Sequence, residues 1–274
     1  MSKNFVRRHK LTLYFTIVLI ISWSIWIPMA LDHLNIIEFP IPLIVGQTLG
    51  ALGIIITLII LEKTTNKEVN VNKIFSTIRL KKAHTLWFVL AAFTIPLLTI
   101  LGNFLNFIAG IDPQFVVFQQ SPLELLGFGL IGVIPLTFFA MLFSSPLLEE
   151  PGWRGFAMNE LQSKFGKHIG SFLLGSFWWM WHLPLYVIYE LEINVFSYLI
   201  MVLHSFMYDS LCNLSEKNLL TAMFTHSSDI IVSYYIFSGS ASIFAFLVFL
   251  IAVIALRVLE WKKQDKSLNL EQKE

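Results

Sequence analysis

Eight apolar runs of about membrane-spanning length follow one another along the 274-residue chain. A helix that crosses the hydrocarbon core of a bilayer needs about 20 predominantly apolar residues. The runs lie at 11–31, 41–61, 85–109, 125–148, 169–189, 195–211, 219–237 and 241–256. Because the backbone polar groups of a spanning segment must be satisfied internally, runs of this length are typical of helices. The sequence therefore predicts an all-α polytopic membrane protein with about eight transmembrane helices.

The distribution of basic residues supports this count. All 19 Lys and Arg residues fall in the two termini or in the connections after the second, fourth and sixth runs. The other four connections contain no Lys or Arg, and their only charged residues are acidic. Basic connections face the cytoplasm in membrane proteins. This pattern predicts that both termini are cytoplasmic, and an odd number of spans would break the alternation.

Composition excludes several other classes of protein. The chain is 56% hydrophobic and 14% charged, whereas about 25% of the residues in a soluble domain are charged. A net charge of +1 gives no electrostatic support for a nucleic-acid partner. The single cysteine, Cys212, excludes an intramolecular disulfide framework and a cysteine-cluster metal site. We expect no cleavable signal peptide and one membrane-embedded domain over 1–274, with a short surface helix within 71–80.

The sequence EEPGWRG at 149–155 closes the charge-free fourth run. An ionisable residue at the edge of a span is a candidate functional residue. Glu150 and Arg154 are four residues apart, so they share one helix face and can pair. This leaves Glu149 as the carboxylate available for chemistry. On these residues alone, an ion pair that merely marks the membrane surface is an equally good interpretation.

Two histidines lie within later apolar runs. His182 lies in the fifth run among three tryptophans, in the sequence FWWMWHLPLY. His226 lies in the seventh run, and Asp229 follows three residues later. That spacing puts both side chains on one helix face, so it predicts that Asp229 fixes the tautomer and orientation of the His226 imidazole.

Other polar residues within the runs are interpreted as structural. His204 lies in the sixth run, and its nearest charge, Asp209, is five residues away and off its helix face. Ser144 and Ser145 end the fourth run without the GxSxG pattern of a nucleophilic serine. We expect the two serines to satisfy backbone polar groups.

One free carboxylate and two imidazoles are sufficient for hydrolysis. Glu149 can take a proton from water as a general base. His182 and His226 can stabilise the oxyanion of a tetrahedral intermediate. The same three side chains could ligate zinc, because two His and one Glu form a known catalytic zinc shell. The HExxH motif is absent, so no metal is implied by motif.

Three segments of the second half resemble one protein family. EEPGWRGFAMNELQSKFG, FWWMWHLPLY and TAMFTHSSD, in this order, resemble the CAAX-protease and bacteriocin-processing family of intramembrane proteases (CPBP, or Abi). The resemblance covers the protease motif core at 144–233. The family has a double glutamate with an arginine four residues after the second, which matches Glu149, Glu150 and Arg154.

The second and third motifs match less completely. His182 occupies the family's histidine position in the fifth run, with Trp178 as the preceding aromatic residue. His226 matches the histidine of the third motif. The family has Asn four residues later, where this chain has Ile230, and the nearest polar residue is Asp229.

The resemblance implies a role for each matching residue. Glu149 would activate the water, while Glu150 and Arg154 would hold the motif's geometry. His182 and His226 would stabilise the oxyanion, or bind zinc together with Glu149 if the enzyme is a metalloprotease. We prefer the glutamate-type mechanism, with no cofactor and with zinc as the alternative.

The implied protein is a multi-pass endopeptidase of the cell membrane that cuts a peptide or protein substrate near the cytoplasmic side of the bilayer. The bacterial branch of the family suggests peptide maturation or bacteriocin immunity. An ion-coupled transporter is an alternative, with Glu149, His182, His226 and Asp229 as the ion path, although no internal repeat supports it. A catalytically idle scaffold of the same fold is a further hypothesis, supported by the changed third motif.

The depths of these residues pose a geometric problem. With a rise of 1.5 Å per residue, His182 lies about 22 Å along its helix from Lys167, whereas His226 lies only about 13 Å from Lys217. Glu149 nominally lies at the membrane edge. The three can meet only if the fifth helix begins in the cytoplasm or is kinked at its proline, and if the Glu149 turn dips into the membrane.

Overall fold

A computed structural model describes residues 3–112, 114–115, 117, 130–236 and 241–271. Within these ranges the regular elements are helices, so the predicted all-α class is confirmed. In chain order they are α1 Lys3–Arg8, α2 Lys10–His33, α3 Leu43–Thr64, α4 Val71–Phe75, η1 Lys82–His84, α5 Thr85–Ile108, α6 Leu130–Met141, α7 Ser145–Glu150, the π-helix η3 Pro151–Ala157, α8 Met158–Phe165, α9 Lys167–Ile188, α10 Val195–Leu214, α11 Leu219–Tyr235 and α12 Ile243–Glu271.

Six helical segments in the described part of the chain are long and apolar enough to cross a membrane. They are Lys10–His33, Leu43–Thr64, Lys82–Ile108, Gly132–Phe165, Val195–Leu214 and Ile243–Asp265. The other two predicted runs, at 169–189 and 219–237, are occupied by α9 and α11. α11 has only 17 residues, and α9 contains two histidines. The protein is therefore a multi-pass membrane protein, while the count of eight spans and the cytoplasmic placement of both termini stay predictions.

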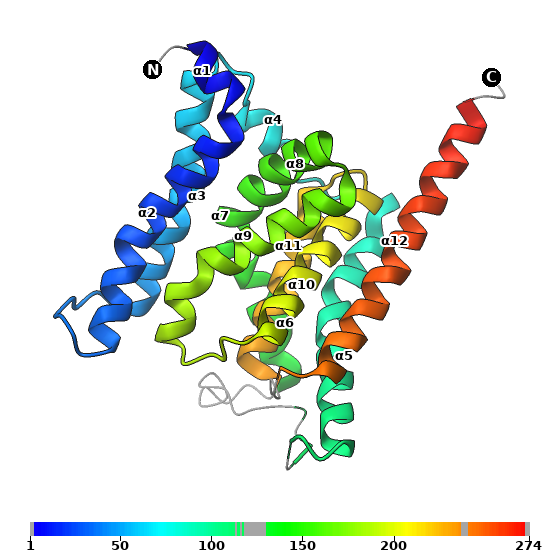
Figure 1. Cartoon of the computed structure of the whole chain (residues 1–274). Helices are drawn as coiled ribbons and strands as arrows, with labels where there is room; N and C mark the ends of the chain where they lie inside the picture. The colour runs from blue at the N-terminus through cyan, green and yellow to red at the C-terminus, as the bar shows by residue number, and fades with distance from the viewer. Residues whose placement is uncertain (1–2, 113, 116, 118–129, 237–240, 272–274) are drawn as a thin grey trace.

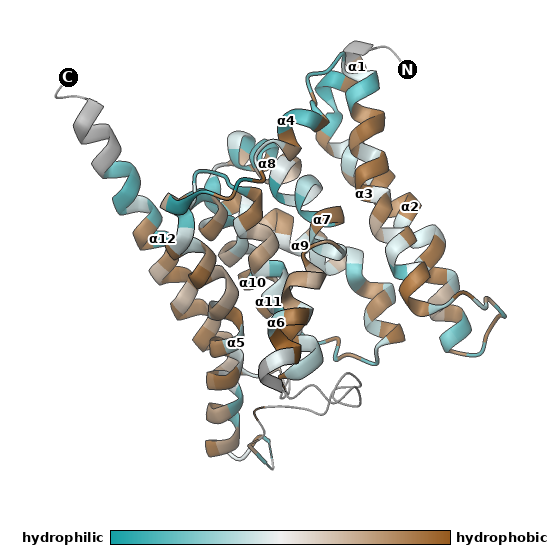
Figure 2. Cartoon of the chain, turned by 180° about the vertical axis from the view of Figure 1, so that it is seen from behind, coloured by the Kyte–Doolittle hydropathy of each residue, from teal (hydrophilic) through white to brown (hydrophobic). Residues whose placement is uncertain are grey.

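The helices form a bundle with one hairpin at its side (Figure 1). α2 and α3 pack against each other, and α2 also contacts α9. α5, α9, α10, α11 and α12 form the larger part of the bundle, and α7 contacts both α3 and α11. α1 and the end of α12 lie at the same end of the molecule (Figure 1). Hydrophobic residues cover the middle of the long helices, as Figure 2 shows for α3, α5 and α12.

The EEPGWRG segment lies inside a continuous helical stretch. Helix continues from Ser145 through this segment to the end of α8 at Phe165, so the helix does not end at residue 148, while the point at which the fourth span leaves the membrane stays a prediction. The side chains of Glu149 and Glu150 are buried within the bundle, where other side chains bind them, and so they are not forced to the membrane surface. Positions 125–129 of the predicted run lie outside the described residues.

The turn between α8 and α9 resolves the problem of depth. The two helices pack together and are joined at Gly166, whose φ of +80° favours glycine. Glu149 precedes Gly166 by 17 residues and His182 follows it by 16, so a helical hairpin brings the two to the same level. The dip of the Glu149 turn into the membrane stays a prediction, whereas α9 continues unbroken through Pro184.

The start of α11 is also covered by protein. Asn218 precedes α11 and is 2% exposed. Its Oδ1 accepts from the backbone N–H of Arg79 at 3.0 Å, and its Nδ2 donates to the Arg79 carbonyl at 2.7 Å. The connection between α3 and α5 therefore lies over this turn. Because protein covers the turn, His226 can lie at the level of Glu149 and His182 even though His226 follows the turn closely. The predicted surface helix in that connection is α4, which is shorter than expected.

Candidate active site

Glu150 and Arg154 form the predicted pair at the centre of the bundle. Nη1 of Arg154 lies 3.3 Å from both carboxylate oxygens of Glu150, and both side chains are fully buried. Asp209 of α10, which the sequence did not assign to this site, lies 3.3 Å from Nε of Arg154. One guanidinium therefore joins two buried carboxylates from different helices.

Two aromatic rings enclose the same guanidinium. The carbon Cζ of Arg154 lies 4.3 Å from the ring centre of Tyr208 and 4.9 Å from that of Trp178. A guanidinium over an aromatic face is attracted by the ring quadrupole, and more strongly where water is excluded. Arg154 is thus held by α7, α9 and α10 together, and the position of Glu150 follows from it.

Glu149 has neutral partners only. It is 4% exposed, and in the described part of the chain it forms no ion pair with a Lys or Arg side chain. One carboxylate oxygen accepts from the hydroxyl of Ser145, and the other lies 3.4 Å from the indole nitrogen of Trp153. The prediction for Ser145 is therefore wrong, whereas Ser144 does bind a backbone carbonyl, that of Met141, at 2.8 Å.

His182 is partly exposed and is oriented by its own helix. Its Nδ1 lies 2.8 Å from the carbonyl oxygen of Trp178, one turn earlier. A carbonyl only accepts, so Nδ1 carries the proton, and Nε2 is the nitrogen left for another group. The Trp178 ring lies 5.4 Å from the imidazole of His182 and 6.0 Å from that of His226, measured between ring centres.

His226 is oriented by Glu150 and not by Asp229. Its Nδ1 lies 2.8 Å from Oε1 of Glu150. Asp229 instead lies 3.2 Å from Nδ1 of His204 and accepts from the hydroxyl of Tyr208 at 3.1 Å. The predicted pairing of His226 with Asp229 is therefore wrong, and His204 has a charged partner that lies on another helix.

The three residues proposed for catalysis come together from α7, α9 and α11. Glu149 adjoins Glu150, which binds His226, and the Trp178 ring contacts the imidazoles of both His182 and His226. Two cavities of about 430 and 500 Å³ are lined by other residues. The predicted cavity that opens from these residues toward the cytoplasm or the inner leaflet stays a prediction.

The first half of the chain also contributes to this region. Tyr14 of α2 is fully buried, its hydroxyl has no hydrogen-bond partner in the described part of the chain, and its ring centre lies 5.8 Å from that of Trp153. A Cβ atom on Gly152 would lie 2.3 Å from this hydroxyl, so only glycine allows the approach of α2 to η3. In the sequence, this contribution was indicated only by a lone tyrosine within an apolar run.

The zinc alternative stays a prediction. Zinc ligands lie about 2.0–2.2 Å from the metal, so their donor atoms must gather closely around one point. In the ranges that the structure describes, no group of three His, Cys, Asp or Glu side chains is already gathered in this way. Glu149, His182 and His226 would be the ligands if the enzyme is a metalloprotease.

The fold and the site define a multi-pass helical membrane protein with a buried glutamate–histidine cluster. Residues 131–229 match the family model described as Type II CAAX prenyl endopeptidase Rce1-like. A CAAX prenyl protease 2 from Methanococcus maripaludis is 40% identical over 63 residues, which are 22% of this chain and 22% of that protein. The match thus spans about a fifth of the relative. The predicted resemblance to the CAAX-protease family is confirmed over 131–229, the segment that contains all the proposed site residues.

Proposed function

We propose that the protein is an intramembrane endopeptidase in which Glu149 activates the attacking water. One observation carries the proposal: Glu149 is a buried carboxylate without a Lys or Arg partner among the described residues, it adjoins Glu150, which binds His226, and one Trp178 ring contacts the imidazoles of both His182 and His226. The match to CAAX endopeptidases over the same segment supports it. The substrate would be a peptide bond near the basic, predicted cytoplasmic side of the protein.

The surroundings of Glu149 suit a general base. Ser145 and Trp153 fix the orientation of its carboxylate by donating to both oxygens, and neither carries a charge that would compete for the proton. In the proposed reaction the water oxygen attacks the peptide carbonyl carbon while Glu149 takes a water proton. The carbon–nitrogen bond then breaks, and the amine leaves with the proton that Glu149 returns.

The two imidazoles are placed to stabilise the oxyanion. Both His182 and His226 use Nδ1 within the protein, so Nε2 is the nitrogen left for the reacting group, and each ring donates from Nε2 to the oxyanion when it carries protons on both nitrogens. The Glu150 carboxylate supplies the counter-charge that His226 needs when it carries protons on both nitrogens. Because Arg154 holds Glu150, the ion pair acts on the oxyanion only through His226, which makes Glu150 and Arg154 positioning residues.

The decisive experiment is peptide cleavage by the purified full chain. Peptides that end in a CAAX sequence are tested with and without a prenyl group, because the relative is named a prenyl protease. We expect Glu149→Ala and Glu149→Gln to lower turnover by about 10²–10⁴-fold while the folded yield is kept. Glu160→Gln is the matched control, since Glu160 pairs with Lys10 at 2.7 Å outside the site. Full activity of Glu149→Gln would refute the assignment.

The zinc alternative has its own test. Treatment of the active protein with phenanthroline should leave cleavage unchanged if Glu149 activates water without a metal. A loss of cleavage that added zinc restores would instead make Glu149, His182 and His226 metal ligands.

A transporter or an idle scaffold would not cleave peptides. For the transporter, the partly buried pair of Asp229 and His204 offers a protonatable path beside His226. Purified protein in liposomes that contain a pH-sensitive dye would then show proton flux that Asp229→Asn abolishes. A protein with neither cleavage nor flux would support the idle scaffold.

A further inference from the structure

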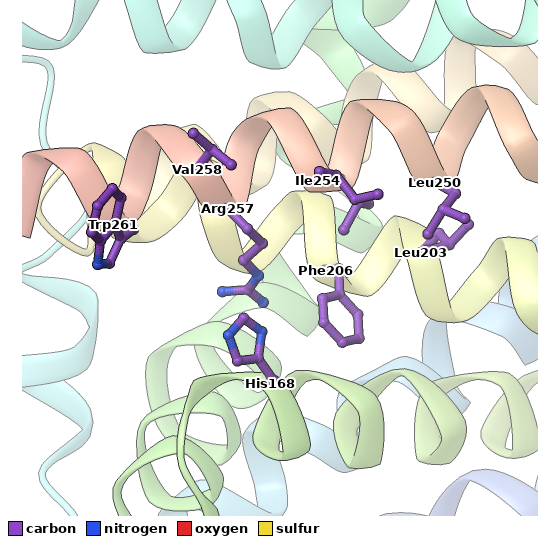
Figure 3. Close-up of a pocket in the computed structure, with 9 residues that line it drawn as sticks. His168, Leu203, Phe206, Leu250, Ile254, Arg257, Val258 and Trp261 are labelled. Atoms are coloured by element: carbon purple, nitrogen blue, oxygen red, sulfur yellow. The ribbon is translucent and has the colours of Figure 1, made fainter.

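A crevice of about 430 Å³ lies on the side of the bundle between α9, α10 and α12. One end is polar: the guanidinium of Arg257 points across it toward the imidazole of His168 (Figure 3). The other end is lined by aliphatic side chains, among them Leu203, Leu250 and Ile254. It shares no lining residue with the candidate active site, so what it binds is independent of the proposed hydrolysis.

Arg257 has an unused hydrogen-bond donor in this crevice. Its side chain is 10% exposed and pairs with Glu260 at 2.9 Å, while its Nη2 donates to Ser171 at 2.6 Å. Its Nε is buried without a hydrogen-bond partner in the part of the chain that the structure describes. A buried donor left unsatisfied is costly, more so on a charged group. The site therefore favours a ligand that brings an acceptor oxygen.

The charges at the polar end favour an anion. Beside the crevice, Lys167 and Arg257 both pair with the carboxylate of Glu260, and the next carboxylate, that of Asp209, pairs with Arg154. His168 lines the same end as Arg257. A phosphate group would supply the missing acceptor oxygen, and arginine is well suited to bind it.

The apolar end has the dimensions of a lipid chain. From Arg257 to Leu250 the crevice follows α12 for about 10 Å, against a hydrocarbon depth of about 15 Å for one leaflet. Ile254 is 54% exposed toward the outside of the bundle. Trp261 lies 64% exposed beyond the polar end, where tryptophan is typical of the membrane interface.

We propose that this crevice binds one anionic phospholipid from the leaflet at the basic end of the protein, which is the predicted cytoplasmic leaflet. The phosphate lies against Arg257 and His168, and one acyl chain lies over Leu203 and Ile254. Basic pockets between membrane helices bind anionic headgroups in this way.

The test is native mass spectrometry of the full chain with phosphatidylglycerol and phosphatidylcholine of identical acyl chains. We expect one retained phosphatidylglycerol and about tenfold or more weaker retention of phosphatidylcholine. Arg257→Gln should remove this preference. Lys262→Gln is the matched control, because Lys262 is exposed on the same helix but does not line the crevice. Equal retention of the two lipids by the unaltered protein would overturn the proposal.

A second pair of variants tests the apolar end without touching the ion pair. Ile254→Trp should fill the crevice and abolish retention, whereas Ile251→Trp, at a position 67% exposed outside the lining, should not. Equal retention by the two variants would overturn the proposal. So would displacement of the lipid by inorganic phosphate while Ile254→Trp has no effect, because that result identifies a site for the headgroup anion only. A dimer that dissociates on Ile254→Trp and retains no lipid would place a second copy of the chain in the crevice.

Discussion

The α2–α3 hairpin and the polar core are held together by different forces. We define the polar core as Glu149, Glu150, Arg154, Asp209 and His226. In the hairpin, small residues let the helices approach closely. The indole of Trp26 donates to the Gly46 carbonyl at 3.0 Å, and the hydroxyl of Ser22 donates to the Gly50 carbonyl at 2.8 Å. Such backbone contacts are the usual means of helix association in membranes.

The polar core instead joins helices through buried charges. α7 and α10 meet at Arg154, and α7 and α11 meet at the bond between Glu150 and His226. Buried ion pairs cost desolvation and contribute little net stability, but the loss of one partner is strongly destabilising. The comparison indicates that the hairpin packs in a way that many apolar sequences could achieve. The polar core instead fixes the positions of the side chains proposed for the reaction.

The largest expected effect on stability comes from Arg154→Ala. This change leaves the carboxylates of Glu150 and Asp209 buried without their shared cation. We expect a loss of about 3–5 kcal/mol in the free energy of unfolding. It is measured by denaturation in detergent and by folded yield. An Arg154→Ala protein as stable as the unaltered one would show that the core does not depend on its charges.

In the hairpin, Gly50→Ala should have the next largest effect. A Cβ atom at Gly50 would lie 2.1 Å from the indole nitrogen of Trp26. Overpacking of this kind costs about 1–3 kcal/mol. The turnover of the folded fraction should be unchanged, since neither Gly50 nor Trp26 has a role in the proposed reaction. Gly132→Ala is the control, because no neighbouring atom lies within 4 Å of a Cβ there; a larger loss in the control would contradict the packing argument.

The same contrast explains what the sequence could predict. The pair of Glu150 and Arg154 depends on spacing within one helix, and it is found. The level shared by Glu149 and His182 is also accessible from the sequence, because the two are nearly equidistant from Gly166. The two alternatives stated from the sequence, a helix start in the cytoplasm or a kink at the proline, did not use that symmetry.

Contacts between helices could not be predicted from the spacing of residues within one helix. Asp209 binds Arg154 from α10, and Asp229 binds His204 across α10 and α11. Helix periodicity places Asp229 on the face of His226, but it does not show which neighbouring helix offers each side chain a better partner. Tyr14 could not be placed beside Glu149 without the packing of α2 on η3.

Tyr208→Phe tests the effect of a hydroxyl group on stability separately from the effect of the charges in this region. The change removes the donor to Asp229, which keeps His204 as a partner. It also keeps the aromatic ring that lies 4.3 Å from Arg154. We expect a loss of about 1 kcal/mol in the free energy of unfolding. Tyr198→Phe on the same helix removes a bond to Ser176 as a matched control. A loss of stability as large as that of Arg154→Ala would show that the hydroxyl hydrogen bonds stabilise this region as much as its charges do.

The smallest effect is expected at Glu216, an exposed residue in the turn before α11, outside both regions. Glu216 lies 3.2 Å from the Lys81 ammonium and 3.4 Å from Nε2 of His84. The hydrogen bond and charge of Lys81, followed by those of His84, hold the pKa of the Glu216 carboxyl below its usual value. A lowered pKa means that the folded protein favours the ionised group, so this contribution to stability is present above the ordinary pKa of about 4.3.

Glu216→Gln should therefore lower the melting temperature slightly at neutral pH and leave turnover unchanged. The difference from the unaltered protein should disappear as the pH falls from about 4.3 through the lowered pKa, since the carboxyl is then protonated in both states. High salt should also reduce it, because exposed charges are screened. A double-mutant cycle with Lys81→Gln isolates the pair. A difference in melting temperature that persists in acid and in high salt would have to come from packing. The turn would then be stabilised as the hairpin is, by packing contacts and not by charges.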